Sequence, residues 1–489
     1  MMKYDAIIIG GGHNGLVCAA YLSKKKFKVL VLEKNEELGG LVNYGSTING
    51  MSTKVLSDLN INLERLNYES LVVALNKDQN HTIIHENDSK INFISSNIKD
   101  EDQKKFNSLI SKYKLYASTL KNFMYETPPR LRSGNTKDTW NLINMGWKIR
   151  KLGTKNMREF LRIIGLNIAD DLEDNIDNDN LKGLLSHEAV LGSNLGPRSP
   201  GSILSLLYKQ SIKEGLFKSE KYNFHELISS LEKTCINQGV EFKNNTQVKR
   251  ILTKNNQANG VMLNNGEEIE GKIIISNVDP KNTYFKLLGT ETLDTDFIRR
   301  AKNIRNKGNV AKLIINLKEK PEINNIKKEQ MNSRFIYAPS INYIENAFNA
   351  NKYNNYANNL CFEFQHCENI IVSNIYYVPY LKDTTHDKEK LTQQCINLFK
   401  PFINNFEVIK ADLSTPNDIE KKCDIAGGHW HHVDFEIDQM LMMRPFYGSA
   451  QYVTPIKNLY LCSAGTHPGG GITGINGRNA AKKIMEDEK

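Results

Sequence analysis

The chain has 489 residues, a length that exceeds one ordinary hydrophobic core and predicts two or three domain-sized units. Hydrophobic residues make up 40% and charged residues 24%, which is typical of a soluble globular protein, and no run of about 18 apolar residues predicts a membrane-spanning helix. The net charge of +9 permits an anionic partner, but the lysines are spread widely, so we expect a solvated surface and no nucleic-acid partner.

The first forty residues predict a strand, a glycine loop, a helix and a second strand. Residues 5–9 are an apolar run of strand length, and the G-x-G-x-x-G loop of residues 10–15 precedes a helical pattern. A second apolar strand ends at Glu33, which follows Gly15 by 18 residues. This order is typical of a dinucleotide-binding Rossmann unit, whose ribose-binding acid lies roughly 20 residues beyond the glycines. The alternative is a glycine-rich turn that binds nothing.

The three glycines of the G-x-G-x-x-G pattern have separate predicted roles. Gly10 allows a sharp turn, Gly12 leaves room for a pyrophosphate beside the backbone, and Gly15 lets the helix pack closely on the strand. Free N–H groups and the positive end of the helix dipole would then bind the phosphates.

A second glycine pair, Gly39 and Gly40, follows the acid. It resembles the second signature of FAD-binding proteins related to glutathione reductase, amine oxidases and phytoene desaturases. The pair therefore favours FAD over NAD as the dinucleotide.

Residues 102–165 have a largely helical pattern rich in Lys and Arg. Trp140, Ile143 and Trp147 make part of it aromatic and amphipathic as well as basic. One interpretation is a face that touches a membrane or admits a lipophilic substrate. The other is an ordinary helical layer with a solvated basic side. The acidic residues 170–179 after it predict a surface connection.

Short strands and a hairpin follow from residue 239 onward. We expect strands at 240–242, 247–252 and 260–263, a tight turn at Asn265-Gly266, and a return strand at 269–276. A β-meander that rejoins a parallel sheet is what an FAD domain of the glutathione-reductase type would contain. In that resemblance the backbone of Val248 would meet the adenine.

A second, mixed α+β unit is predicted from later strands at 310–317, 334–338, 360–364 and 371–378 and a helix at 388–399. The predicted fold is therefore α/β: a glutathione-reductase-type FAD-binding Rossmann domain with a β-meander, plus an inserted α+β substrate domain. We assign 1–65, 215–284 and 425–489 to the discontinuous FAD-binding domain, and 66–214 and 285–424 to the substrate domain.

The C-terminal residues predict a return to the first domain. A strand at 458–462 precedes a glycine-rich loop at 463–471 and a helix at 472–485. The loop matches G-x-G-x-x-G, but no downstream strand with a ribose-binding acid remains, so we interpret it as a loop beside the flavin ring. The N-terminus of the helix would suit the negative charge of a reduced flavin.

Residues 427–432, Gly-Gly-His-Trp-His-His, are the polar cluster outside these loops. The spacing of His429, His431 and His432 is not that of a zinc site, so we predict no metal. We name His429 and His432 as catalytic candidates, because an imidazole accepts a proton near neutral pH. The alternative is histidines packed at a domain junction.

Three stretches resemble the phytoene dehydrogenase-like flavoproteins of the FAD-dependent amine oxidase superfamily: GGGHNGL near the start, GGHWHH with DQMLMMRP at 427–445, and LYLCSAGTHPGGGITGINGRNAA at 459–481. The nearest branch is that of the pyridine nucleotide-disulfide oxidoreductase domain proteins. The family's glycine-rich turn is replaced at 219–225 by Ser-Glu-Lys-Tyr-Asn-Phe-His. The resemblance and the motifs together give these candidate cofactor-binding residues: Gly10, Gly12, His13, Asn14, Gly15, Glu33, Lys34, Gly39, Gly40, Val248, Gly465, Gly470, Gly471 and Ile472.

The predicted function is an FAD-dependent oxidoreductase that dehydrogenates or desaturates a lipophilic small molecule by hydride transfer to the flavin. Oxygen or a quinone would reoxidise the flavin, and the absence of a second nucleotide fold argues against NAD(P)H. Two alternatives remain: a flavin amine or amino-acid oxidase, and a non-catalytic FAD-binding scaffold.

Seven scattered cysteines form no C-x-x-C pair, which suits a reducing compartment and argues against a disulfide reductase. The N-terminus offers no signal-peptide pattern. We expect a cytoplasmic protein, with peripheral membrane contact left open.

Overall fold

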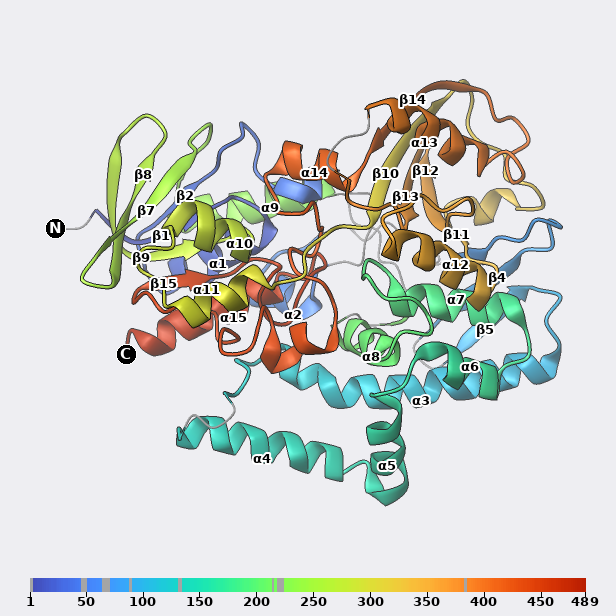
Figure 1. Ribbon diagram of the computed structural model, residues 1–489, viewed down its shortest axis with the longest axis horizontal. Coiled ribbons are helices and arrows are strands. Elements are labelled where there is room, and N and C mark those ends of the chain that lie inside the picture. The colour runs from blue at the N-terminus through green and yellow to red at the C-terminus, as the bar shows by residue number, and fades with distance from the viewer. Residues whose placement is uncertain are drawn as a thin grey trace.

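Two β-sheets lie side by side, with a helical layer along both (Figure 1). The computed structural model describes residues 3–44, 51–63, 71–87, 90–130, 134–212, 215–217, 224–381 and 385–489. The first sheet has seven strands and lies near both chain ends, and the second has eight. The predicted α/β class with two sheets is thus confirmed.

The first sheet is parallel at its centre. Its strand order is β6-β2-β1-β9-β15, with β8 and β7 continuing antiparallel from β9. Its elements and their neighbours are β1 (Tyr4–Ile9), α1 (His13–Ser23), β2 (Val29–Leu32), η1 (Gly40–Tyr44), α2 (Thr53–Leu59), α9 (Phe224–Asn237), β6 (Glu241–Lys243), β7 (Val248–Lys254), β8 (Gln257–Leu263), β9 (Glu268–Ser276), α10 (Pro280–Asn282), η2 (Thr283–Leu288), α11 (Thr295–Lys302), β15 (Leu459–Leu461) and α15 (Ile475–Asp487).

Strand β1 is apolar from Ala6 to Ile9, where both of its faces are covered. Ala6 and Ile8 pack in the same core cluster as the residues of α1. Ile7 and Ile9 pack in a second cluster with Val248 and Val261 of the meander. A central parallel strand buried on both faces has no solvated side, so it needs no polar alternation.

The meander is formed by β7, β8 and β9, and β9 then pairs in parallel with β1. The strand predicted at 240–242 is not part of the meander, because β6 pairs in parallel with β2 at the sheet edge. Residues 218–223, which contain most of the stretch where the family's glycine turn is missing, lie outside the described residues.

Helices α1 and α15 cross in close contact and join the two ends of the chain. A Cβ atom at Gly477 of α15 would lie 2.1 Å from the carbonyl oxygen of Asn14 on α1. A Cβ atom at Gly15 would lie 2.4 Å from the carbonyl oxygen of Gly10. Both glycines are therefore needed for close packing, as predicted for Gly15.

The second sheet has the order β14-β10-β13-β12-β11-β3-β4-β5, antiparallel except between β11 and β3. Strands β3, β4, β5 and β14 are additions to the predicted strands. Its elements are β3 (Leu71–Ala74), β4 (Thr82–Glu86), β5 (Ile91–Ser95), β10 (Val310–Leu317), η3 (Lys328–Gln330), β11 (Arg334–Tyr337), α12 (Ile341–Lys352), β12 (Phe362–Cys367), β13 (Ile370–Tyr376), α13 (Thr385–Asn397), β14 (Val408–Ser414) and α14 (Pro416–Cys423). The proposed domain boundaries stay a prediction.

One face of the second sheet is an aromatic core. Phe335 stacks on Phe364 at 4.9 Å between ring centroids, and Phe362 lies 4.8 Å from Phe399, just beyond α13. The opposite face is polar: Lys312, Asn374 and other polar side chains of these strands line a cavity.

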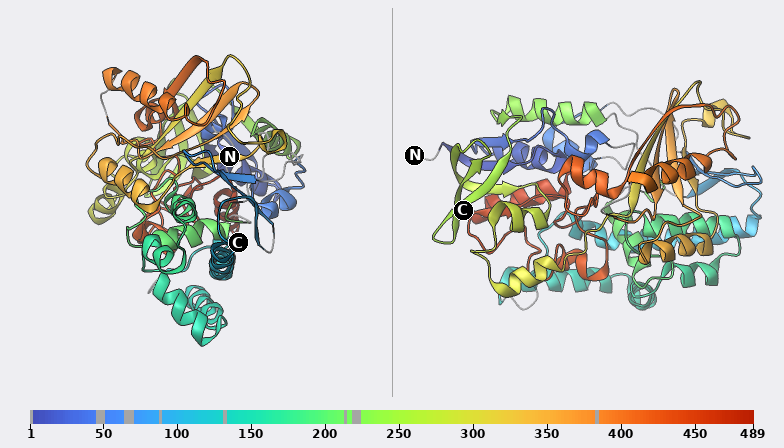
Figure 2. Two further views of the ribbon diagram at one scale, coloured as in Figure 1. Left: turned by 90° about the vertical axis from the view of Figure 1, so that its right-hand side faces the viewer. Right: turned by 45° about the horizontal axis from the view of Figure 1, so that its top comes forward.

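Helices from residues 100 to 212 form a layer beside both sheets (Figures 1 and 2). They are α3 (Asp100–Met124), α4 (Thr136–Arg150), α5 (Gly153–Ile163), α6 (Ile168–Asn175), α7 (Asp179–Val190) and α8 (Ser202–Ile212). The acidic residues predicted as a surface connection at 170–179 are mostly exposed, but Ile168–Asn175 form helix α6. Asp171 is the exception, because it is buried and accepts a hydrogen bond from the hydroxyl of Tyr113 at 2.6 Å.

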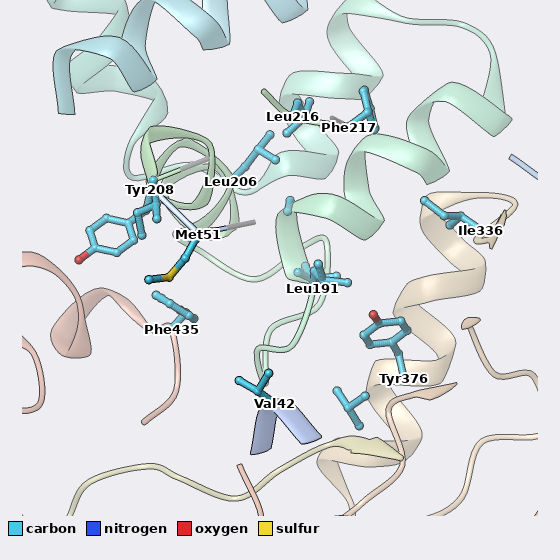
Figure 3. Close-up of a cluster of buried hydrophobic side chains, with 14 of the residues drawn as sticks. Val42, Met51, Leu191, Leu206, Tyr208, Leu216, Phe217, Ile336, Tyr376 and Phe435 are labelled. Atoms are coloured by element: carbon cyan, nitrogen blue, oxygen red, sulfur yellow. The ribbon is translucent and has the colours of Figure 1, made fainter. Parts of the chain in front are cut away.

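The buried core joins segments that are distant in the sequence. Figure 3 shows Met51, Tyr208 of α8 and Phe435 close together, and the rings of Tyr208 and Phe435 lie 5.9 Å apart. Two short helical turns, η4 (Ile437–Gln439) and η5 (Leu441–Met443), follow Phe435. Within the described ranges, no helix is long and apolar enough to cross a membrane.

We expect Gly477→Ala to destabilise the protein, because the new methyl group meets the backbone of α1. The cost of such overpacking is about 1–3 kcal/mol or more. Gly146→Ala is the matched control, since Gly146 lies in α4 and a Cβ atom there would have nothing within 4 Å. It should be neutral or stabilising by roughly 0.5–1 kcal/mol. Thermal melting of both variants checks this, and equal melting temperatures would contradict the packing argument.

Candidate functional site

A cavity of about 530 Å³ lies between the two sheets. One half is lined by the loops that follow β1, β2 and β9, and the other half by the polar face of the second sheet. The histidine segment at 428–432 and the C-terminal loop at 470–473 line it as well. A volume of this size is within the usual range of roughly 300–1,000 Å³ for ligand sites.

The two N-terminal glycine signatures are joined by backbone pairing. The N–H of Gly39 donates to the carbonyl of Gly11 at 3.0 Å, and Gly12 and Gly39 form a parallel bridge. Gly12 is the N-cap of α1, and no side chain caps this helix end. An uncapped helix N-terminus at a cavity is suited to a phosphate group.

Glu33 is buried at the end of β2 and lines the cavity. Its Oε2 accepts a hydrogen bond from the N–H of Gly11 at 2.7 Å, and its Oε1 accepts one from the N–H of Asn35 at 3.0 Å. These bonds fix the carboxylate, and each oxygen retains a second lone pair for a ligand hydroxyl.

The C-terminal loop meets both the glycine loop and the histidine segment. The His13 imidazole faces the backbone of Gly471, and burial lowers the pKa of His13 to about 4. A Cβ atom at Gly470 would lie 1.8 Å from His431 Nδ1. The loop therefore fits against His431 only because residue 470 is glycine.

Most of the candidate cofactor-binding residues line this one cavity. Two do not: Gly15 packs against Gly10, and a Cβ atom at Gly465 would meet Pro280 at 2.5 Å. Ile472 lines the cavity but is not the start of the helix, because α15 begins at Ile475 after Gly474 in a left-handed conformation. The candidates at the cavity wall are Gly10, Gly12, His13, Asn14, Glu33, Lys34, Gly39, Gly40, Val248, Gly470, Gly471 and Ile472.

The catalytic candidates His429 and His432 also lie at the wall, beside Trp430 and His431. His429 Nδ1 accepts a hydrogen bond from the N–H of His431 at 3.1 Å, and its Nε2 lies 3.7 Å from a carboxylate oxygen of Asp434. Burial lowers the pKa of His432 to about 3, helped by nearby His13 and Arg444. A group with so low a pKa is a weak base at neutral pH. A catalytic role for these histidines stays a prediction.

No group of three or more His, Cys, Asp or Glu side chains in the described part of the chain is placed to hold a metal ion.

Arg444 is fully buried and connects the histidine segment to the C-terminal loop. Its guanidinium lies within hydrogen-bond distance, 2.8–3.2 Å, of six backbone carbonyl oxygens, so two of them share one of its five N–H groups. It also lies 4.7 Å from the ring centre of Phe435. Burial lowers its pKa to about 10, so it stays a cation at neutral pH. The six acceptors are the carbonyls of His431, Val433, Asp434, Gln439, Ala464 and Thr466.

A row of polar side chains crosses four strands of the second sheet at the far wall of the cavity. Ser414, Lys312, Asn374 and Glu363 are neighbours in the strand registers, and all four line the cavity. No motif in the sequence predicted this row. The available signal was Lys312 itself, a single charge inside the apolar strand 310–317.

The two charged members of the row have opposite surroundings. Glu363 accepts hydrogen bonds from Arg334 Nε at 2.7 Å, Asn374 at 2.9 Å and the hydroxyl of Tyr376 at 2.5 Å. Burial alone would raise the pKa of Glu363, but Arg334 outweighs it and holds the pKa at about 2. Lys312 has no ion pair with any residue that the structure describes, and burial lowers its pKa to about 7.

The cavity fits a large polar ligand such as FAD. Six buried atoms of its wall residues have no hydrogen-bond partner among the described residues: His13 Nε2, Asn14 Oδ1, Asn309 Oδ1, His429 Nε2, Trp430 Nε1 and His432 Nδ1. Buried polar groups are nearly always satisfied in native proteins, so these atoms indicate a missing partner. Gly12 and Glu33 lie at the same wall, as a pyrophosphate and a ribose would require.

The chain matches one protein-family model and is similar to several known proteins. The model of the family described as flavin-containing amine oxidoreductase matches residues 15–485. The chain is 24% identical to the mouse pyridine nucleotide-disulfide oxidoreductase domain-containing protein 2, over 100% of this chain and 94% of that protein. It is also 24% identical to one of the polypeptides of limonene dehydrogenase from Castellaniella defragrans, over 99% and 94% of the two chains.

Among solved structures, putrescine oxidase with bound putrescine is similar in fold. Its TM-score is 0.60 at 11% identity, and the match covers 99% of this chain and 98% of that one.

Glu33→Gln should weaken FAD binding about 10- to 100-fold, because a hydrogen bond to a charged carboxylate is worth roughly 1.5–3 kcal/mol. Titration of flavin-free protein with FAD, followed by flavin fluorescence, measures the change. Glu37→Gln, at an exposed position four residues on, is the control and should bind FAD normally. Unchanged affinity in Glu33→Gln would remove this residue from the site.

Arg444→Lys should lower stability by about 3–5 kcal/mol, because an ammonium cannot satisfy six carbonyl oxygens in a buried site. The midpoint of urea unfolding should fall, and bound flavin should be released at lower urea. Arg300→Lys is the control, since Arg300 lies at the surface beside Tyr447 and should change stability by less than about 0.5 kcal/mol. Equal midpoints for the two variants would contradict the role given to Arg444.

Proposed function

The chain belongs to the flavin-containing amine oxidoreductase family, and on that basis we propose an FAD-dependent dehydrogenase that desaturates a lipophilic organic substrate. The substrate loses one hydride and one proton and gains a double bond. Bound FAD supplies the hydride acceptor. The observation that carries the proposal is the continuity of one cavity from Gly12 and Glu33 to the polar row that contains Lys312.

Lys312 is the proton acceptor in this proposal. Its amine lines the cavity, has no counter-ion among the described residues, and has a pKa of about 7 because of burial. A neutral amine can take a proton from a substrate carbon while the hydride leaves, and a base works best when its pKa lies near the working pH. His429 and His432 then act as hydrogen-bonding wall groups.

Two of the relatives that match over nearly their full length have names that support a terpenoid-like substrate. The limonene dehydrogenase polypeptide is one, and 4,4'-diaponeurosporene oxygenase of Staphylococcus aureus is another. Apolar wall residues such as Leu191, Ile314 and Val372 suit the body of such a substrate. The polar row predicts that the substrate also carries one hydrogen-bonding group.

An amine oxidase is the second candidate, supported by the family and by the fold of putrescine oxidase. A protonated amine would need an anionic partner in the cavity. Glu363 is already committed to Arg334, but Asp412 of β14 also lines the cavity and has no ion pair with any residue that the structure describes. Asp412 is therefore available to pair with an ammonium, and the choice between the two candidates rests on the substrate test.

The two candidates are separated by anaerobic mixing of the purified holoprotein with panels of unsaturated terpenoids and of primary amines. Bleaching of the flavin absorbance by the first panel, with a product lighter by two hydrogens in mass spectrometry, is expected. Bleaching by amines alone, with an aldehyde product, would replace desaturation by amine oxidation. Bleaching by neither panel would favour the non-catalytic scaffold. Parallel reoxidation with oxygen and with a quinone identifies the acceptor.

Lys312→Met should slow flavin reduction about 10²–10⁴-fold, the usual contribution of a general base. In the natural protein the reduction rate should rise with pH through about 7, because only the neutral amine accepts a proton. The variant should lose this dependence. Lys422→Met, which removes another lysine at the cavity wall, should keep it. A pH profile unchanged in Lys312→Met would exclude Lys312 as the base.

The same variant should be more stable than the natural protein below pH 7. The folded-state pKa of Lys312, about 7, lies below its ordinary value of 10.5, so the buried ammonium destabilises the folded chain at low pH. This cost is complete below about pH 7 and disappears as the pH rises towards 10.5. Melting temperatures at about pH 6 and pH 9 measure the gap, which should narrow at the higher pH. If Lys312→Met lost activity because it unfolds, its melting temperature at about pH 6 would instead be lower than that of the natural protein.

A further inference from the structure

Helix α4 is apolar on two opposite sides. Its inner side places Leu142, Met145 and Ile149 towards the body of the protein, where they are partly buried. Its outer side carries Trp140, Ile143 and Trp147, which are 69%, 56% and 60% exposed. A helix that is apolar all round is normally buried. The outer side of α4 therefore lacks a partner within the described chain.

The three exposed side chains form one continuous stripe. Positions 140, 143 and 147 are separated by three and four residues, so they share a face of the helix. Helices α4 and α5 stand out from the rest of the molecule, and α4 lies along its outer edge (Figures 1 and 2). Large exposed apolar patches of this kind mark interaction sites.

The orientation of the stripe is fixed by contacts on the inner side. Asp138 is buried and accepts a hydrogen bond from Gln451 at 3.1 Å. Lys137 forms an ion pair with Glu486 of the C-terminal helix at 2.6 Å. With its inner side held in this way, α4 must present Trp140 and Trp147 outward.

The surroundings of the stripe are strongly basic. Residues 134–165 contain seven Lys or Arg and two acids. Both acids are engaged, since Asp138 bonds Gln451, and Glu159 pairs with Arg162 at 2.8 Å. Within the described part of the chain, five of the basic residues have no acidic partner: Lys148, which lies over the ring of Phe123, and Arg150, Lys151, Lys155 and Arg158.

We propose that this docking face, formed by Trp140, Ile143 and Trp147 with the basic residues 150–158, binds the surface of an anionic phospholipid bilayer. Tryptophan prefers the boundary between headgroups and acyl chains, where its ring is apolar and its N–H is solvated. A helix with an apolar stripe beside Lys and Arg lies in that boundary and is attracted to anionic lipid. Charge complementarity selects this partner. The proposal does not depend on the reaction that the cavity performs.

The natural distribution of tryptophan gives a direct test. The chain has three tryptophans, two on the docking face and Trp430 at the cavity wall. Mixing the holoprotein with phosphatidylcholine–phosphatidylserine vesicles should shift tryptophan emission to the blue, and brominated acyl chains should quench it. Pure phosphatidylcholine vesicles should give a smaller effect. An unshifted spectrum with the anionic vesicles would overturn the proposal.

Sedimentation with the same vesicles tests the residues. The double variant Trp140→Ser/Trp147→Ser should bind about tenfold or more weakly, since partition scales with buried apolar area. Arg150→Glu/Lys151→Glu should also weaken binding and reduce its dependence on salt. The matched control is Tyr353→Ser/Ile409→Ser, which removes two side chains that are about as exposed but lie elsewhere. If the control variant lost as much vesicle binding as the tryptophan variant, Trp140 and Trp147 would not form the membrane-binding face.

Two further measurements separate membrane binding from misfolding and from self-association. Flavin absorbance and melting temperature should be unchanged in the tryptophan variant, because the docking face touches neither the cavity nor the core. Analytical ultracentrifugation without lipid should find the same mass for the natural protein and the variant. A natural oligomer that the variant dissociates would assign the face to a second copy of the chain and overturn the membrane proposal.

Discussion

The constraint on which the site depends is the burial of one guanidinium. Arg444 has no solvent contact, and it donates to carbonyl oxygens on both the segment 431–439 and the loop 464–466. A buried cation with such partners cannot move without leaving several carbonyl groups unsatisfied. The histidine segment and the C-terminal loop are consequently held together as one unit, and His431 fits against Gly470 within it. The cavity wall keeps its shape because this unit is fixed.

The first sheet and its glycine loop could be predicted because their signals are local. Glycines at 10, 12 and 15, an acid after a buried strand, and the Asn265-Gly266 turn each act within a few residues of their neighbours. The parallel sheet and the meander followed from them and are confirmed. Errors arose at edges: the strand at 240–242 joins the sheet and not the meander, and α15 begins at Ile475 because Gly474 takes a left-handed conformation before it.

The rest of the site could not be predicted because its contacts are distant in the chain. Lys312, Asn374 and Glu363 become neighbours only through strand register across β10, β13 and β12. The carbonyl partners of Arg444 could not be recognised from the sequence, because every residue has a backbone carbonyl whatever its side chain. The acidic pattern around Asp171 predicts surface charge, yet this residue is buried with Tyr113, a partner that lies 58 residues away. Local pattern contains no information about such pairs.

In the second sheet, the side chains that line the cavity and those that form the aromatic core lie on opposite faces, so evolution can change one set without the other. Along β10, Val310, Lys312 and Ile314 face the cavity, whereas Ala311, Leu313 and Ile315 are buried in the core. Because successive side chains alternate between the faces, a lineage can exchange every second residue of the strand and reshape the cavity while the aromatic core stays intact. Selection for a new substrate and selection for the packing of the aromatic core then act on different positions of the same strand. A scaffold with this property can diversify its cavity by single substitutions that leave the aromatic core unchanged.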